Sequence, residues 1–188
     1  MTDDPYVYPG TSILRNKHGI VDAVELDRIE RLLVRQRANE RLPSGDFDLT
    51  HLRAIHRHLF QDVYDWAGEI RTVEISKGGD QFMLRQYIHN GMADVHRRIV
   101  EADYFTGLSR DDFAAAAGRI TGDVNYVHPF REGNGRTQLL YLKRLSARAG
   151  QRLDLRRLDP AGWIEASKRA NRTDYDLMIA IIRRALDE

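Results

Sequence analysis

The chain has 188 residues, of which 42% are hydrophobic and 30% are charged, and its formal net charge is +1 at pH 7. The length is enough for one globular domain with a hydrophobic core, and the composition is ordinary for a soluble protein. A net charge near zero, with no block of lysine or arginine, argues against strong nonspecific binding to nucleic acid, which requires clustered cations. The absence of cysteine excludes disulfides, thiolate metal sites and a cysteine nucleophile.

Nothing in the sequence indicates a secretory signal or a membrane anchor. The first residues, MTDDPYVYPG, are acidic and lack the apolar stretch of a signal peptide. No apolar run approaches the roughly 18 residues of a membrane span. We therefore expect a cytoplasmic protein with no membrane partner, and secretion by a route without a signal peptide stays open.

The pattern of apolar residues predicts a mostly helical domain. Prolines and glycines in residues 1–19 indicate an irregular lead-in. Beyond it, apolar residues recur at helical spacing over about 22–42, 49–63, 86–102, 109–126, 134–149, 160–170 and 174–186. Residues 71–83 differ, because Val73 and Ile75 alternate with polar residues before the turn sequence "KGGD". The prediction is a single all-α domain over 1–188 with one small β-hairpin.

Three histidines on the predicted second helix, His51, His56 and His58, resemble a metal cluster in their spacing. At 100° per residue they flank opposite sides of the apolar stripe and do not converge. We therefore expect surface or boundary histidines here.

The segment between two predicted helices, "VHPFREGNGR" from Val127 to Arg136, concentrates reactive side chains. Two glycines around an asparagine open the second helix, where backbone N–H groups and the helix start favour an anion. Arg136, in the first helical turn, can place a guanidinium on the same anion. Glu132 can hold Mg²⁺ against phosphates, and His128 suits a general base. The alternative is that this segment has no chemical role and is only a helix end followed by a loop with positive φ at the glycines.

The string "HPFREGNGR" resembles the signature of the Fic family, H-P-F-x-[DE]-G-N-G-R-x-x-R. The layout is similar over most of the chain, with helices around the motif and a hairpin upstream. The resemblance implies the Fic fold: a single helical domain with a hairpin flap at 71–83 and an active-site loop and helix start at 126–139.

The resemblance also implies protein AMPylation, in which AMP passes from ATP to a Ser, Thr or Tyr hydroxyl with Mg²⁺ as cofactor. It implies that His128 is the catalytic base and that Glu132 is the magnesium ligand. It implies nucleotide binding by a set of residues in and before the loop: Lys77, Glu132, Gly133, Asn134, Gly135 and Arg136. It further implies that a target segment docks as an added strand on flap residues: Ile75, Ser76, Lys77, Gly78 and Phe82.

The final signature position departs from the family, since Leu139 replaces the second arginine. Residues 136 and 139 lie one turn apart on one helical face, so an arginine at 139 would face the same phosphates. Its loss removes a charge-assisted contact of about 1.5–3 kcal/mol. Weak use of ATP, another phosphate ligand and a different donor are all open explanations. A fourth explanation is that Leu139 is simply a core residue of this helix.

The self-inhibitory pattern of many Fic proteins, [ST]-x-x-x-E-[GN], is absent from this sequence. The resemblance then implies either a separate small antitoxin that supplies that helix or no such inhibition. A domain of this size is similar to bacterial, antitoxin-regulated Fic toxins and secreted effectors, which makes a type II topoisomerase subunit a candidate target.

Two other functions stay open. One is a different Fic transfer, either of a phosphoryl or of a phosphocholine group. Against phosphorylation, related kinases are similar to H-P-F-x-x-G-N-K-R, with lysine where this chain has Gly135. The other is a catalytically weak binding module, which Leu139 favours and the intact His128, Glu132 and Arg136 oppose.

Overall fold

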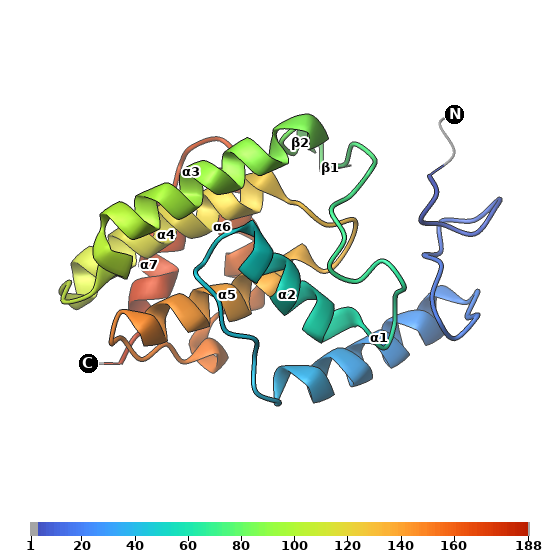
Figure 1. Cartoon of the computed structure of the whole chain (residues 1–188), viewed down its shortest axis with the longest axis horizontal. Coiled ribbons are helices and arrows are strands. Elements are labelled where there is room, and N and C mark those ends of the chain that lie inside the picture. The colour runs from blue at the N-terminus through green and yellow to red at the C-terminus, as the bar shows by residue number, and fades with distance from the viewer. Residues whose placement is uncertain (1–3, 188) are drawn as a thin grey trace.

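The computed structural model describes residues 4–187, which form seven α-helices, three short 3₁₀ helices and one two-stranded hairpin. Their bounds are α1 Ala23–Ala38, α2 Leu49–Phe60, β1 Ser76–Lys77, β2 Asp80–Gln81, η1 Arg85–Tyr87, α3 Ile88–Glu101, η2 Asp103–Phe105, α4 Arg110–Val127, α5 Asn134–Arg148, η3 Leu155–Arg157, α6 Pro160–Ala170 and α7 Asp176–Ala185. The expected all-α class with one hairpin is confirmed (Figure 1).

Helix α4 is the centre of the packing. It contacts α3, α5, α6 and α7, while α1 covers α2 and α2 packs on α5 (Figure 1). The loop from α4 to α5 therefore has both of its ends fixed in the interior of the bundle.

The helix starts follow from capping side chains. The side chains of four residues accept a hydrogen bond from a backbone N–H in the first helical turn: Asp22, Asp48, Ser109 and Asp159. Such caps satisfy donors that the helix leaves unpaired, as the Asp48 side chain does for the His51 N–H. The ends were overestimated for the first two helices, since α1 stops at Ala38 and α2 at Phe60. After each stop the next residue's N–H bonds to a carbonyl of the last turn and the chain turns away.

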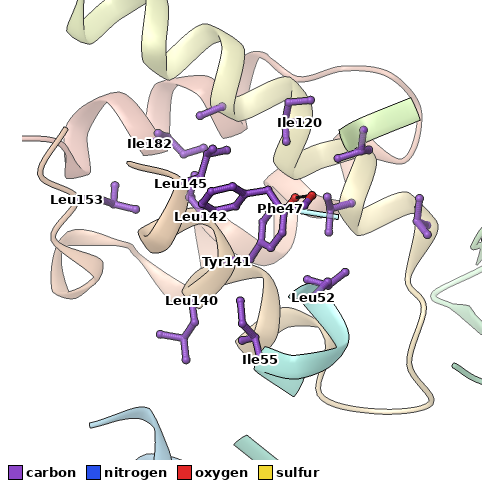
Figure 2. Close-up of a cluster of buried hydrophobic side chains, with 14 of the residues drawn as sticks. Phe47, Leu52, Ile55, Ile120, Leu140, Tyr141, Leu142, Leu145, Leu153 and Ile182 are labelled. Carbon is purple, nitrogen blue, oxygen red and sulfur yellow. Dashed lines mark hydrogen bonds between the residues drawn. The ribbon is translucent and has the colours of Figure 1, made fainter. Parts of the chain in front are cut away.

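The core between α2 and α5 is shown in Figure 2. Leu52 and Ile55 of α2 lie on the side of Tyr141 of α5, and all three are at most 3% exposed. The Tyr141 hydroxyl donates to the carbonyl of Phe47, just before α2. Burying these large side chains, at roughly 1.5–3 kcal/mol each, clamps α2 against the helix that begins the candidate site.

The hairpin and the lead-in lie beside that loop. In the hairpin Ser76 pairs with Gln81 and Lys77 with Asp80, and the turn uses positive φ at both of its glycines. The lead-in is irregular except for one bridge, Val7 to Leu14. It is not wholly superficial, because Tyr6 is buried. Within residues 4–187, no helix is both long enough and apolar enough to cross a membrane.

Candidate active site

The loop over residues 128–133 is bounded by two left-handed residues. His128 ends α4 with φ 46°, and Gly133 precedes α5 with φ 81°. A Cβ added to Gly133 would lie 2.3 Å from Cζ of Phe60, so both the backbone conformation and the close approach require glycine there. Gly135 has no such neighbour within 4 Å, and its backbone faces open space.

One asparagine fastens the interior of this loop. The Asn134 side chain donates to the Phe130 carbonyl at 2.7 Å and accepts from the Phe130 N–H at 3.0 Å. Both residues are at most 3% exposed, so without Asn134 two buried backbone groups would lack partners. Asn134 therefore shapes the loop from inside.

His56 of α2 supports the same loop, and the expectation of a surface or boundary position was wrong. The His56 side chain is fully buried, and His51 is only 2% exposed. The contacts of His56 explain its burial. Its Nε2 donates to the Glu132 carbonyl at 2.9 Å, its Nδ1 accepts from the Gly68 N–H at 2.8 Å, and its ring stacks on Phe130 at 3.9 Å. Helical spacing could not reveal this role, because the partners come from distant parts of the chain.

His128 has the geometry of a base. Its Nδ1 lies 2.9 Å from the Asn125 carbonyl, which can only accept, so Nδ1 carries the proton and Nε2 keeps a lone pair. Burial lowers the pKa of His128 to about 4, which leaves the imidazole neutral near pH 7. Phe82 stacks on the ring, and Arg71 donates from Nε to the His128 carbonyl at 2.8 Å.

A cleft of about 520 Å³ opens between the loop, the hairpin and α6. Most of the predicted site residues line it: Ile75, Ser76, Lys77, Phe82, His128, Glu132, Gly133, Asn134 and Gly135. Two predicted residues, Gly78 and Arg136, are not among its lining residues. The structure thus brings the hairpin and the loop, far apart in sequence, to one cavity.

Of the far wall of this cleft, the sequence suggested only Asn171, which follows a predicted helix. The wall consists of side chains from α6 and the residue after it: Trp163, Ile164, Ser167, Lys168 and Asn171. The floor includes Gln138 and Asn125, whose amides approach within 3.5 Å, and Asn125 also donates to Asn171 at 2.8 Å. No local motif marks α6, so only its packing against α4 could identify it.

Arg136 lies beside Glu132, outside the main cleft. Its Nη2 is 2.6 Å from Oε1 of Glu30 and 3.5 Å from Oε1 of Glu132. It lines a neighbouring hollow of about 540 Å³, and Glu132 borders both this hollow and the main cleft. Leu139, one turn further along α5, packs against the core.

Glu132 is the carboxylate that could hold a metal. Its side chain is 46% exposed, and one of its oxygens accepts from the Gly133 N–H at 2.8 Å. Within residues 4–187, no three acidic or histidine side chains gather as a metal-binding group. One carboxylate fits Mg²⁺, since Mg²⁺ commonly takes one or two carboxylates together with substrate phosphates and water.

A family model described as Fic/DOC matches residues 46–145. The probable protein adenylyltransferase y4lH of Sinorhizobium fredii is 42% identical over 98% of this chain and 96% of its own length. The protein adenylyltransferase VbhT of Bartonella schoenbuchensis is 36% identical over the whole chain, which spans 40% of that longer protein.

Among solved structures, the chain is similar to the ADP-bound N-terminal Fic domain of a VirB-translocated Bep effector protein from Bartonella quintana. The TM-score is 0.89 at 27% identity, over 97% of this chain and 94% of that one. With the family model covering more than half of the sequence, these matches show that the chain belongs to the Fic/DOC family.

Proposed function

We propose that this chain is a protein adenylyltransferase, an enzyme that transfers AMP from ATP to a Ser, Thr or Tyr hydroxyl of a target protein. The observation that carries the proposal is the neutral His128, whose Nε2 keeps its lone pair beside a loop that lines the cleft through Glu132, Gly133, Asn134 and Gly135. Relatives that align over nearly the whole chain bear the name protein adenylyltransferase. The domain that carries this activity is proposed to be the single unit 1–188.

The chemistry requires one proton transfer and one substitution at phosphorus. Nε2 of His128 takes the proton of the target hydroxyl, whose oxygen then attacks the α-phosphorus of ATP. The bond from that phosphorus to the bridging oxygen of the β-phosphate breaks, and pyrophosphate leaves. Attack and departure require the α-phosphate to lie next to His128, where backbone N–H groups of the loop stabilise its charge.

The nucleotide-binding residues proposed here are Gly133, Asn134, Gly135, Glu132, Arg136 and Lys77. Glu132 would hold Mg²⁺, which neutralises phosphate charge when bound. Arg136, from the neighbouring hollow, would bind the phosphates beyond the α-phosphate, and Lys77 lines the main cleft from the hairpin. Leu139 contributes no charge, so this loop has fewer phosphate ligands than the family signature provides.

The target is proposed to dock on the hairpin. Ser76, Lys77 and Gly78 are exposed, and Ile75 and Phe82 flank them toward the cleft. A short exposed strand can pair with an extended segment through main-chain hydrogen bonds that tolerate different sequences. A type II topoisomerase subunit is the proposed target, and a small antitoxin is the proposed regulator. Use of ATP implies action in a cytoplasm, either the bacterium's own or, after secretion, that of a host.

The decisive experiment compares [α-³²P]ATP with [γ-³²P]ATP in a bacterial lysate, with Mg²⁺ and the His128→Ala variant as control. A band that depends on His128 and carries only the α label is the expected result. A band with only the γ label would show phosphorylation instead. Absence of both labels, with nucleotide still bound, would favour a binding module. Purified topoisomerase subunits that stay unlabelled while another protein is labelled would remove them as targets.

A further inference from the structure

A buried carboxylate interrupts the apolar stripe of α1. Leu26, Glu30 and Val34 are the buried residues of this helix, spaced one turn apart, and Glu30 is 7% exposed. A carboxylate at such a position is costly to bury unless both oxygens are partnered, and an apolar side chain would pack there without that cost. The partners of Glu30 should therefore explain its presence.

Both oxygens of Glu30 are in use. Oε1 forms the ion pair with Nη2 of Arg136 at 2.6 Å, and Oε2 accepts from the hydroxyl of Tyr64. Burial, and next the charge of Glu30, raise the pKa of Tyr64, so the hydroxyl stays protonated and donates. Tyr64 is 1% exposed, so its hydroxyl is held in place by packing and fixes the position of the carboxylate.

Arg136 is held from three sides. Besides Glu30, its guanidinium lies 4.7 Å from the centroid of the Phe60 ring and 3.5 Å from the carboxylate of Glu132. The same Phe60 ring is the surface on which Gly133 packs. The arginine and the start of the anion-binding loop therefore share one support, and α1 is connected to it through Glu30.

The contacts leave much of the guanidinium available. Nη2 makes the closest approach in the ion pairs of Arg136 with Glu30 and with Glu132. Nε and Nη1 make no hydrogen bond to another residue in the range 4–187. A guanidinium has five N–H donors in a fixed fork, so anchoring one nitrogen orients the others without using them.

We infer that Glu30, seated by Tyr64, is a positioning residue that holds Arg136 for the β- and γ-phosphates of the bound nucleotide. This inference rests on the proposed function, because attack at the α-phosphorus requires the α-phosphate beside His128. Glu132 borders both the cleft that His128 lines and the hollow that Arg136 lines, so the remaining phosphates would extend past Glu132 toward Arg136. Leu139 cannot replace it, so the orientation of this one arginine decides the binding of those phosphates.

The test measures binding of ATP, ADP and AMP, each with Mg²⁺, by calorimetry on the full chain carrying His128→Ala to prevent turnover. Adding Glu30→Gln should weaken ATP and ADP about tenfold, the ratio for one charge-assisted hydrogen bond, and leave AMP unchanged. Tyr64→Phe should produce the same pattern with a smaller change. Asp27→Asn, an exposed carboxylate at the border of the same hollow, is the matched control and should change none of the three.

Other patterns would overturn the inference. Equal weakening of all three nucleotides would reduce Glu30 to a structural residue, and tighter ATP binding would mean that Glu30 competes with the phosphates for Arg136. If Glu30→Gln fails to fold, an unchanged ratio of ATP to AMP affinity in Tyr64→Phe overturns the inference equally. If the His128→Ala chain binds no ATP, the proposed function itself is contradicted. If it binds ATP and adding Glu30→Gln does not change that affinity, only the positioning role is contradicted.

Discussion

The ring of Phe82 lies flat on the imidazole of His128, with centroids 3.6 Å apart and planes 17° apart. Phe82 follows β2 of the hairpin, and His128 ends α4, so this stack joins the surface proposed for target docking to the proposed base. It also covers one face of the imidazole and contributes to the burial that lowers the pKa of His128. A target segment that docks on the hairpin would therefore act beside a base already shielded from water.

Replacing Phe82 with alanine should raise the pKa of His128 from about 4 toward the ordinary value of 6.5, by about one unit or more. The cause is renewed hydration of the protonated ring. Proton NMR titration of the imidazole measures this shift. Tyr87→Ala changes an exposed side chain just beyond the hairpin and should leave the pKa in place. A pKa that does not move in Phe82→Ala would show that the helix and loop alone bury the imidazole.

Stability should fall in mild acid because of His56. Burial lowers the pKa of His56 from 6.5 to about 4 in the folded state. Between these values the unfolded chain binds a proton that the folded chain excludes, so the free energy of unfolding decreases as pH falls from about 6.5 to about 4. We expect a loss of about 2–3 kcal/mol from this one group, with little change above pH 7. Urea unfolding at several pH values measures it.

His56→Gln is the control for that pH dependence. Glutamine has no titrating group there, so the variant, although less stable at pH 7, should show a shallower decline toward pH 4. Parallel profiles for the two proteins would assign the acid sensitivity to other groups.

The two loop glycines should respond oppositely to alanine. Gly133→Ala forces a Cβ into the Phe60 ring at a positive φ, and we expect it to cost roughly 2 kcal/mol or more in stability. Gly135→Ala meets nothing within 4 Å and lies in α5, so stability should hold or rise by up to about 1 kcal/mol. Nucleotide binding should nevertheless weaken, since the new methyl group borders the anion cradle.

Thermal unfolding and nucleotide titration of both glycine variants check this contrast. Phe60→Leu combined with Gly133→Ala should recover part of the lost stability, because leucine is smaller than the ring. Equal stability losses in Gly133→Ala and Gly135→Ala would contradict the close approach.

Restoring the missing arginine should strengthen nucleotide binding. Leu139 is half-buried against the core, so a longer side chain at this position can extend its charged end into solvent. Leu139→Arg should lower the KM for ATP about tenfold, as one added charge-assisted contact of about 1.5 kcal/mol implies. Lost core packing should cost about 1–2 kcal/mol of stability. Leu139→Gln, which removes the same apolar contact without adding charge, should show the stability loss and no gain for ATP.

The sequence by itself determined the helical class, the hairpin and the composition of the loop. These are local properties: helical spacing places α1 through α7, "KGGD" encodes a turn that needs positive φ, and the loop motif is one continuous string. A motif of this kind identifies chemistry because its residues act side by side in the chain. The fold class and the family were therefore predictable, and both are confirmed.

Only the tertiary structure decided which distant residues support that loop. His56 was misjudged because its hydrogen-bond partners, Gly68 and the carbonyl of Glu132, are set by packing and not by helical spacing. No sequence pattern marks Glu30, whose role depends on the placement of α1 beside Tyr64 and Arg136. Burial and pairing depend on the whole fold, because the cost of a charge is set by what surrounds it, and no local pattern encodes that surrounding.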